Sequence, residues 1–202
     1  MEHRFGAAIL AAGMSSRMGR PKLLLPWGQY SVLEHLVHQW QELRATQLAV
    51  VLSSENGPVA QELNRMGFPA AARILNPRAE AGMFSSIQCA ADWTGWRTGI
   101  GHVAVALGDQ PHLRTATLRR LLEFASRHPE EVCQPGQAGK AYHPVLLPWA
   151  EFRRMIAAKT PDLRGYLLSC RVALCDVDDP GLTLDLDTPA EYEAALRMAF
   201  PQ

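Results

Sequence analysis

The sequence is poor in the features that mark membrane proteins and nucleic-acid binders. Its 20 lysine and arginine residues equal its 20 aspartate and glutamate residues, so the formal net charge is zero. Nucleic-acid binders usually carry a basic excess, and this balance therefore argues against that class. No stretch reaches the roughly 18 apolar residues of a membrane-spanning helix. We expect neither nucleic acid nor a membrane as a partner.

Cysteine is also scarce. Only four cysteines occur among the 202 residues, with no CxxC pair and no histidine at metal-ligand spacing. This pattern favours reduced thiols over a zinc site or a disulfide framework. The opening HRFGAAILAAG has the basic start and short apolar run of a signal peptide, yet its cleavage would remove a whole strand. We therefore expect a cytoplasmic protein.

Apolar runs of strand length alternate with segments of helical periodicity along the chain. Strands are expected at 5–11, 47–53, 72–75, 102–107 and 172–177, and helices at 31–44, 57–66, 82–92, 113–126, 148–158 and 162–170. Runs that are apolar throughout are typical of strands buried on both faces of a parallel sheet. The order predicts an α/β fold with three layers around a doubly wound, mostly parallel sheet.

Two later segments depart from this alternation. Glycine and proline are frequent in 131–147, which predicts a small β flap or hairpin over the edge of the sheet. Thr188, Pro189 and Glu191 form a capping box that predicts the start of a last helix. No repeat or linker divides the chain, so residues 1–202 are expected to form a single domain.

The first candidate site is the loop LAAGMSSRMGRPKLLLP, which follows the first predicted strand. Five residues separate Gly13 from Gly19, so the loop is neither a Walker A motif nor GxGxxG. Its glycines allow close backbone approach, while Arg17 and Lys22 supply positive charge for a phosphate. The alternative is a solvated basic turn, and the loop alone does not decide between them.

Carboxylates form the second candidate site. Asp109 follows the strand at 102–107, and Asp185 and Asp187 flank Leu186 in an extended segment that turns both to one side. Ligands of open α/β sheets bind at the carboxyl ends of the strands, where Asp109 and one of this pair could hold Mg²⁺. A turn or cap role for Asp109, and solvation of the pair, are the alternatives.

Five segments together carry a family resemblance. LAAGMSSRMGRPKLLLP, NPRAEAGMFSSI, LGDQP, HPVLLP and LTLDLDTPAEY occur in this order between about residues 6 and 196. They resemble the nucleotidyltransferases of the molybdenum-cofactor group, and GMFSSI and LDLDTP resemble the cytidylyl branch in particular. The resemblance implies a Rossmann-like, GT-A-like nucleotidyltransferase fold. It also implies transfer of CMP from CTP to the terminal phosphate of molybdopterin, with release of pyrophosphate and Mg²⁺ as cofactor.

The resemblance also implies residue roles on the nucleotide side. The backbone of Leu10, Ala11 and Ala12 would hold the base. Gly13, Met14 and Ser15 would wrap the triphosphate. Arg17 and Lys22 would neutralise the α-phosphate and the leaving pyrophosphate. Ser85, in the helix that begins after Gly82, would help to read cytosine.

For the metal and the acceptor, the resemblance implies a second set of roles. Asp109 would bind Mg²⁺, with Asp187 as the second ligand and Asp185 as its rival. His143 would touch the acceptor phosphate, or serve as a structural histidine. Tyr142 stands where the family commonly has glycine, which would reshape the acceptor side and leaves the pterin acceptor open.

Three alternatives to this function remain from the sequence. The first is a related transferase that uses GTP or another phosphorylated acceptor. The second is a non-catalytic carrier of the molybdenum cofactor, and the third is a module that only senses nucleotide. A molybdenum hydroxylase or its maturation factor is the further partner that the resemblance suggests.

Overall fold

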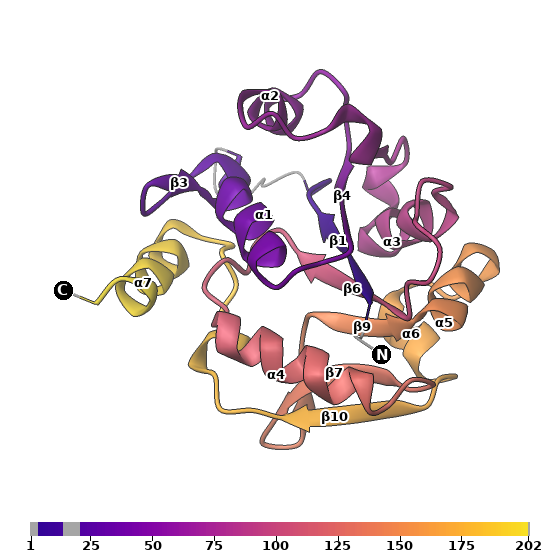
Figure 1. Ribbon diagram of the computed structural model, residues 1–202. Helices are drawn as coiled ribbons and strands as arrows, with labels where there is room; N and C mark the ends of the chain where they lie inside the picture. Colours follow the sequence, from indigo (N-terminus) through magenta and orange to yellow (C-terminus); the bar gives the residue numbers. More distant parts are fainter. Residues whose placement is uncertain (1–3, 14–20, 202) are drawn as a thin grey trace.

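Parallel strands form the centre of the protein in a computed structural model that describes residues 4–13 and 21–201 (Figure 1). β1 (Phe5–Leu10) pairs in parallel with β4 (Gln47–Leu52) on one side and with β6 (His102–Leu107) on the other. The sheet order is β10-β7-β9-β6-β1-β4-β5, and β8 pairs with β7. The alternation of elements therefore produces the expected doubly wound sheet.

The remaining strands are β2 (Pro26–Trp27), β3 (Tyr30–Ser31), β5 (Arg73–Leu75), β7 (Val132–Gln137), β8 (Lys140–Ala141), β9 (Val145–Pro148) and β10 (Val172–Asp176). The helices are α1 (Val32–Glu42), α2 (Pro58–Arg65), α3 (Met83–Asp92), α4 (Thr115–Ser126), α5 (Trp149–Arg154), α6 (Leu163–Leu167) and α7 (Pro189–Ala199). Two short 3₁₀ helices matter for the site, η2 (Lys22–Leu24) and η6 (Pro180–Thr183).

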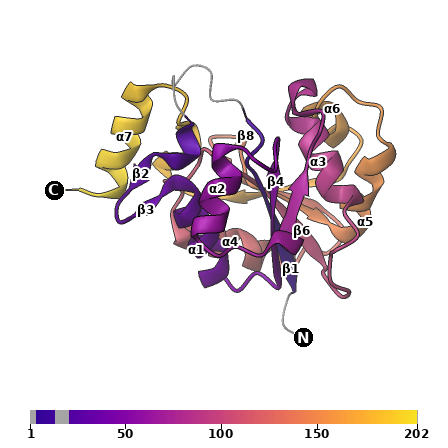
Figure 2. The ribbon, with the colours of Figure 1, turned by 90° about the horizontal axis from the view of Figure 1, so that it is seen from above.

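Helices cover the two faces of the sheet as separate layers. Figure 2 shows these layers on the two sides of the central strands. α1, α2, α4 and α7 pack on one face, and α3, α5 and α6 pack on the other. The first core lies between the sheet and α1, α2, α4 and α7, and the second core lies between the sheet and α3, α5 and α6. Ala7 and Ile9 of β1 belong to the first core and Ala8 to the second, because successive side chains of a strand point to opposite faces of the sheet. The predicted three-layer arrangement is confirmed. Among the described residues, no helix is both long and apolar enough to span a membrane.

The segment 131–147 differs from the expected flap. β7 and β9 lie inside the sheet, where β9 pairs antiparallel with both β6 and β7, and only β8 lies off the main path. Pro135 and Gly136 suggested a loop, yet both are buried in β7. Pro135 fits because its carbonyl can still accept the backbone N–H of Tyr142, at 2.9 Å, although it has no N–H of its own. The result is a mixed sheet that is mostly parallel.

The last helix begins as the sequence predicts. The Thr188 hydroxyl accepts the backbone N–H of Glu191 at 3.3 Å and donates to its carboxylate at 2.7 Å. α7 then packs on the β2–β3 hairpin, where the Tyr192 hydroxyl donates to the Pro26 carbonyl and Phe200 meets Trp27 edge to face at 5.6 Å. The hairpin follows η2, so α7 is anchored beside the segment that carries Lys22.

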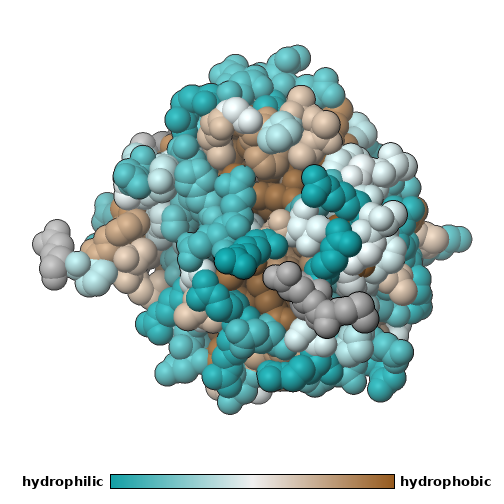
Figure 3. Space-filling view, viewed as in Figure 1, coloured by the Kyte–Doolittle hydropathy of each residue, from teal (hydrophilic) through white to brown (hydrophobic). Residues whose placement is uncertain are grey.

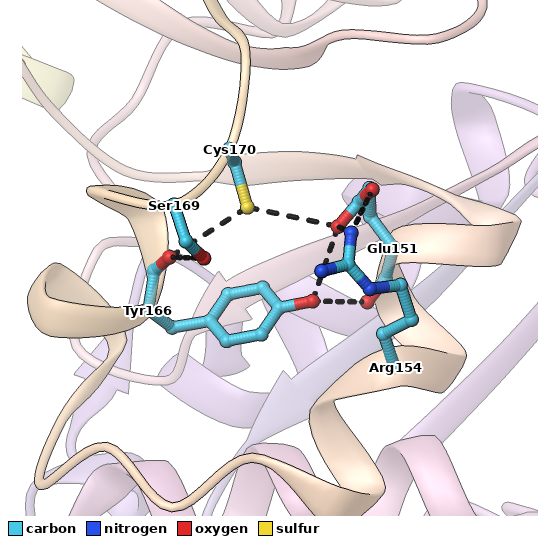
Figure 4. A network of polar contacts seen from close by, with 5 residues as sticks. All are labelled: Glu151, Arg154, Tyr166, Ser169 and Cys170. Carbon is cyan, nitrogen blue, oxygen red and sulfur yellow. Dashed lines mark hydrogen bonds and ion pairs between the residues drawn. The ribbon is translucent and has the colours of Figure 1, made fainter.

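A polar network joins α5 to α6 on the opposite face (Figure 4). The Glu151 carboxylate pairs with Arg154 at 2.7 Å and accepts the Tyr166 hydroxyl at 3.1 Å. The Cys170 thiol points at the same carboxylate, at 3.6 Å. Burial, and then the charge of Glu151, raise the pKa of this thiol, which therefore stays protonated near neutral pH. The network serves to hold the two helices together.

The face on which the strands begin is turned toward the viewer in Figure 3. Polar side chains surround apolar hollows on this face. One groove lies between α1 and α4 and is lined by Phe5, Leu43 and Leu122. None of the residues proposed from the sequence for the site lines it, because those residues follow the opposite ends of the strands.

The four cysteines are free thiols, and Cys133 and Cys175 are buried. Burial raises the pKa of Cys133 to about 12. Because the thiolate is the reactive form, we expect iodoacetamide at pH 8 to label Cys133 far more slowly in the folded protein than after unfolding in urea. Peptide mapping by mass spectrometry would measure this. Equal labelling of Cys133 in folded and unfolded protein would contradict the buried position.

Candidate active site

A cavity of about 340 Å³ opens at the carboxyl ends of β1 and β6. Its walls come from the ends of these strands, from η2 and from the start of α3. The lining residues are Leu10, Ala12, Gly13, Lys22, Leu23, Ala79, Glu80, Gly82, Met83, Ser86, Leu107, Gly108 and Asp109. Six of the residues proposed from the sequence are therefore gathered here: Leu10, Ala12, Gly13, Lys22, Gly82 and Asp109.

Gly108 brings Asp109 close to the loop after β1. A Cβ atom at Gly108 would lie 2.7 Å from the Leu10 carbonyl oxygen and 2.8 Å from a methyl group of Leu23, so only glycine fits this contact. The Gly108 backbone N–H also donates to the Leu10 carbonyl at 3.2 Å. The backbone at the end of β6 is therefore fixed against the end of β1, with Asp109 directed into the cavity.

Lys22 lies between two carboxylates. Its Nζ is 2.6 Å from Oδ2 of Asp109 and 3.2 Å from Oδ1 of Asp187, and the three side chains are between 14% and 25% exposed. Burial acts to lower the pKa of Lys22, but the charges and hydrogen bonds of Asp109 and Asp187 raise it overall. The ammonium group therefore keeps its charge, and it offsets the repulsion between the two carboxylates.

Asp185 lies beside this group without contacting Lys22 in the hydrogen bonds that the structure shows. Its carboxylate accepts the Gln110 side-chain amide at 3.3 Å. Partial burial, and then the negative charge of Asp109, raise the pKa of Asp185. Asp187 is therefore better placed than Asp185 to act together with Asp109, and its role as the second metal ligand stays a prediction.

The donor set fits a divalent cation that also binds phosphate. Among residues 4–13 and 21–201, no three His, Cys, Asp or Glu side chains are grouped to hold a metal by themselves. Asp109 and Asp187 nevertheless converge on one cationic group, the Lys22 ammonium. Mg²⁺ is commonly bound by one or two carboxylates, with water and substrate phosphates as its other ligands. Two carboxylates at this position are therefore sufficient.

The start of α3 forms the opposite wall. Gly82 has φ +96°, a conformation that favours glycine, and a Cβ there would meet nothing within 4 Å. Ser86 lines the cavity. The Ser85 hydroxyl instead lies 2.8 Å from the Gly82 carbonyl oxygen and 3.0 Å from the Arg78 carbonyl oxygen. These two acceptors hold the hydroxyl within the protein. The proposed reading of cytosine by Ser85 therefore does not match its position, and the neighbouring Ser86 is the residue at the cavity.

Asn76 was missed by the sequence reasoning. Its side chain is fully buried, and its amide donates to the hydroxyls of Ser85 at 2.8 Å and Ser86 at 3.0 Å. Its carbonyl oxygen accepts the backbone N–H of Arg78 at 2.9 Å. Asn76 thus fixes both the loop before α3 and its first turn. The residue stands in NPRAEAGMFSSI, so the motif was noted, but its partners could not be inferred from spacing.

Other residues proposed from the sequence have different positions. Ala11 is buried and donates its backbone N–H to the Val51 carbonyl at 2.9 Å, so its side chain belongs to the core. Met14, Ser15 and Arg17 lie outside the described residues.

The acceptor-side pair stays a prediction. Tyr142 is half-buried and packs against the first core. His143 is also half-buried, and its buried Nδ1 atom has no hydrogen-bond partner among the described residues. Burial lowers the pKa of His143, although the Val105 carbonyl and the charge of Asp109 oppose the change. Neither residue lines the cavity described above.

Comparisons with known proteins identify relatives of this chain. The sequence profile of the MobA-like NTP transferase domain matches residues 7–174. The molybdenum cofactor cytidylyltransferase of Escherichia coli K12 is 25% identical over 190 residues, which cover 93% of each chain. The bifunctional protein GlmU of Cereibacter sphaeroides is 29% identical over 139 residues, or 65% of this chain, and the chain spans 30% of the length of GlmU.

A solved structure supports the fold. Rv0371c of Mycobacterium tuberculosis H37Rv, in complex with manganese, superposes with a TM-score of 0.67 at 23% identity. The alignment covers 96% of this chain and 98% of that one. A likeness at this identity shows a shared α/β architecture over almost the whole chain.

Asn76 should be important for stability. Replacing Asn76 with alanine removes the donor to two buried hydroxyls, and we expect a loss of about 1–3 kcal/mol in the free energy of unfolding. Urea denaturation would measure the loss. The matched control is Asn56→Ala at an exposed position, which should change stability by less than about 0.5 kcal/mol. Equal effects at the two positions would show that the Asn76 network does not stabilise the wall.

Proposed function

Because this chain belongs to the MobA-like NTP transferase family and is a nucleotidyltransferase, we propose that it transfers CMP from CTP to the terminal phosphate of a molybdopterin-type cofactor. Pyrophosphate is the second product. The observation that carries this proposal is the contact of Lys22 with both Asp109 and Asp187 beside a cavity of about 340 Å³ that Lys22 and Asp109 line. The relative from Escherichia coli, which matches over nearly its full length, supports the choice of nucleotide and acceptor.

In the proposed reaction, an oxygen of the acceptor phosphate attacks the α-phosphorus of CTP. A new P–O bond forms to the acceptor while the bond from the α-phosphorus to the bridging oxygen of pyrophosphate breaks. A phosphate monoester is ionised near pH 7, so the attack needs no protein base, and we assign none. The chain has to position the two phosphates in line and to stabilise the negative charge that moves onto pyrophosphate.

Lys22 is the residue best placed for that charge. It is positively charged and borders the cavity, and it is held by carboxylates that a phosphate can replace as partners. Arg17, in the same loop, would supply a second positive charge. Asp109 and Asp187 would hold Mg²⁺. The chemistry that Mg²⁺ supplies when bound is neutralisation of phosphate charge.

Substitution of Lys22 or Asp109 tests the proposal. We expect Lys22→Ala and Asp109→Asn each to slow pyrophosphate release from CTP and molybdopterin by about 10²-fold or more. The first removes the positive charge proposed to stabilise the departing pyrophosphate, and the second removes a carboxylate proposed to hold Mg²⁺. Circular dichroism should report an intact fold. Lys159→Ala and Asp92→Asn, at exposed positions outside the cavity, are the controls and should stay within about twofold of the unaltered protein. Near-normal release by both site variants would refute the assignment.

Nucleotide choice can be tested separately. A ligand that binds only the folded protein increases the free energy of unfolding by RT ln(1 + [L]/Kd), and the melting temperature rises as a result. With Mg²⁺ present, we expect CTP to raise the melting temperature more than GTP at the same concentration. A larger shift with GTP would replace the cytidylyl assignment with a guanylyl one. Binding of CTP without pyrophosphate release from any phosphorylated acceptor would favour a sensing or carrier role instead.

A further inference from the structure

We propose that His112 is a positioning residue that fixes the distance between the two proposed metal-binding carboxylates, Asp109 and Asp187. It acts through a clasp, which we define as His112 and Asp179 together with their backbone partners in the segment 179–184. The inference rests on the proposed function, because it assigns the clasp to the same metal site. It concerns residues that do not themselves touch the cavity.

The His112 ring joins the two acidic segments directly. His112 is 5% exposed and follows Asp109 by three residues. Its Nε2 lies 3.1 Å from the Gly181 carbonyl oxygen and 3.0 Å from the Leu184 carbonyl oxygen. Both partners only accept hydrogen bonds, so Nε2 carries the proton and donates to both. One ring therefore holds the turn that leads into Asp185 and Asp187.

Asp179 closes the clasp from the other side. Its side chain is fully buried and accepts the Gly181 backbone N–H at 2.9 Å. It also accepts the Arg114 backbone N–H at 3.1 Å and the Thr117 hydroxyl at 2.7 Å. Arg114 and Thr117 lie at the start of α4, directly after the segment that carries Asp109 and His112. Asp179 thus ties η6 to the same part of the chain as His112 does.

Glycine at position 181 allows the close approach of His112 and Asp179. A Cβ atom on Gly181 would lie 3.0 Å from Cδ2 of His112 and 3.1 Å from Oδ1 of Asp179. Both distances are tighter than most Cβ contacts, so an added methyl group would require the ring or the carboxylate to move by a few tenths of an ångström. The clasp therefore depends on three side-chain identities at once, and it leaves little freedom for the turn to shift.

The need for such a clasp follows from the charges. Asp109 is far in the sequence from the segment that carries Asp185 and Asp187, and the carboxylates of the two segments repel each other except where the Lys22 ammonium offsets the charge. The chain between η6 and α7 is irregular, so its own backbone does not hold Asp187 in place. A clasp that keeps the turn beside Asp109 reduces the ordering that metal binding would otherwise require.

Direct metal binding tests the role of His112. Mn²⁺, with CTP present and no acceptor, can be titrated by following the free-ion signal in electron paramagnetic resonance. We expect His112→Leu to weaken Mn²⁺ binding about tenfold, because both carbonyl contacts are lost. His112→Gln keeps an amide donor and should restore binding to within about threefold. His38→Leu, at an exposed histidine of α1, is the control and should bind as the unaltered protein does.

Gly181→Ala provides a second variant that leaves His112 in place, should His112→Leu fail to fold. It should weaken Mn²⁺ binding in the same direction, with the melting temperature of the metal-free protein measured alongside. Unaltered Mn²⁺ affinity in folded His112→Leu, or equal weakening by the leucine and glutamine variants, would overturn the clasp alone. Absence of Mn²⁺ and CTP binding by the unaltered protein would instead overturn the proposed function.

Discussion

The ammonium group of Lys22 is the point on which the site depends. Two carboxylates from separate parts of the sequence, Asp109 and Asp187, converge on it, and without a cation they would repel each other in a partly buried setting. The fold places both carboxylates. Asp109 follows the tight glycine turn at the end of β6, and Asp187 lies in the segment that leads into α7. In the proposed reaction, a nucleotide phosphate would replace a carboxylate as the partner of Lys22, and a metal ion would bind the carboxylates.

Periodicity in the sequence was enough to predict most of the fold. The central strands and the longer helices lie within about two residues of the predicted bounds, because apolar spacing determines which face is buried. The exception is 131–147, where Pro135 and Gly136 were interpreted as loop residues. Their strand is buried between β10 and β9, and pairing partners of that kind depend on the whole sheet. Composition alone does not contain this information.

The sequence predicted which motifs line the site, but not which atoms of those motifs contact one another. Asp109 and Lys22 were proposed because their residue types suit metal and phosphate, Gly82 was proposed from the family resemblance, and all three line the cavity. The sequence interpretation assigned Ser85, whereas Ser86 lines the cavity. Neighbouring residues on a helix point about 100° apart, and the rotation of the helix could not be known from the sequence. The proposed role of His112 was missed for another reason. Its partners are backbone carbonyls, and because every residue has one, a sequence motif cannot indicate which carbonyls a side chain contacts.

The order of the strands also governs when the site exists during synthesis of the chain. β1 can pair with β4 early, but its second neighbour, β6, emerges only after α3 has been made. Asp187 comes later still, after β10. A nascent chain interrupted directly after β10 would already contain Lys22 and Asp109 but not Asp187, so Lys22 would face one carboxylate where the complete protein has two. The proposed metal binding through both carboxylates would therefore be among the last properties that the growing chain acquires.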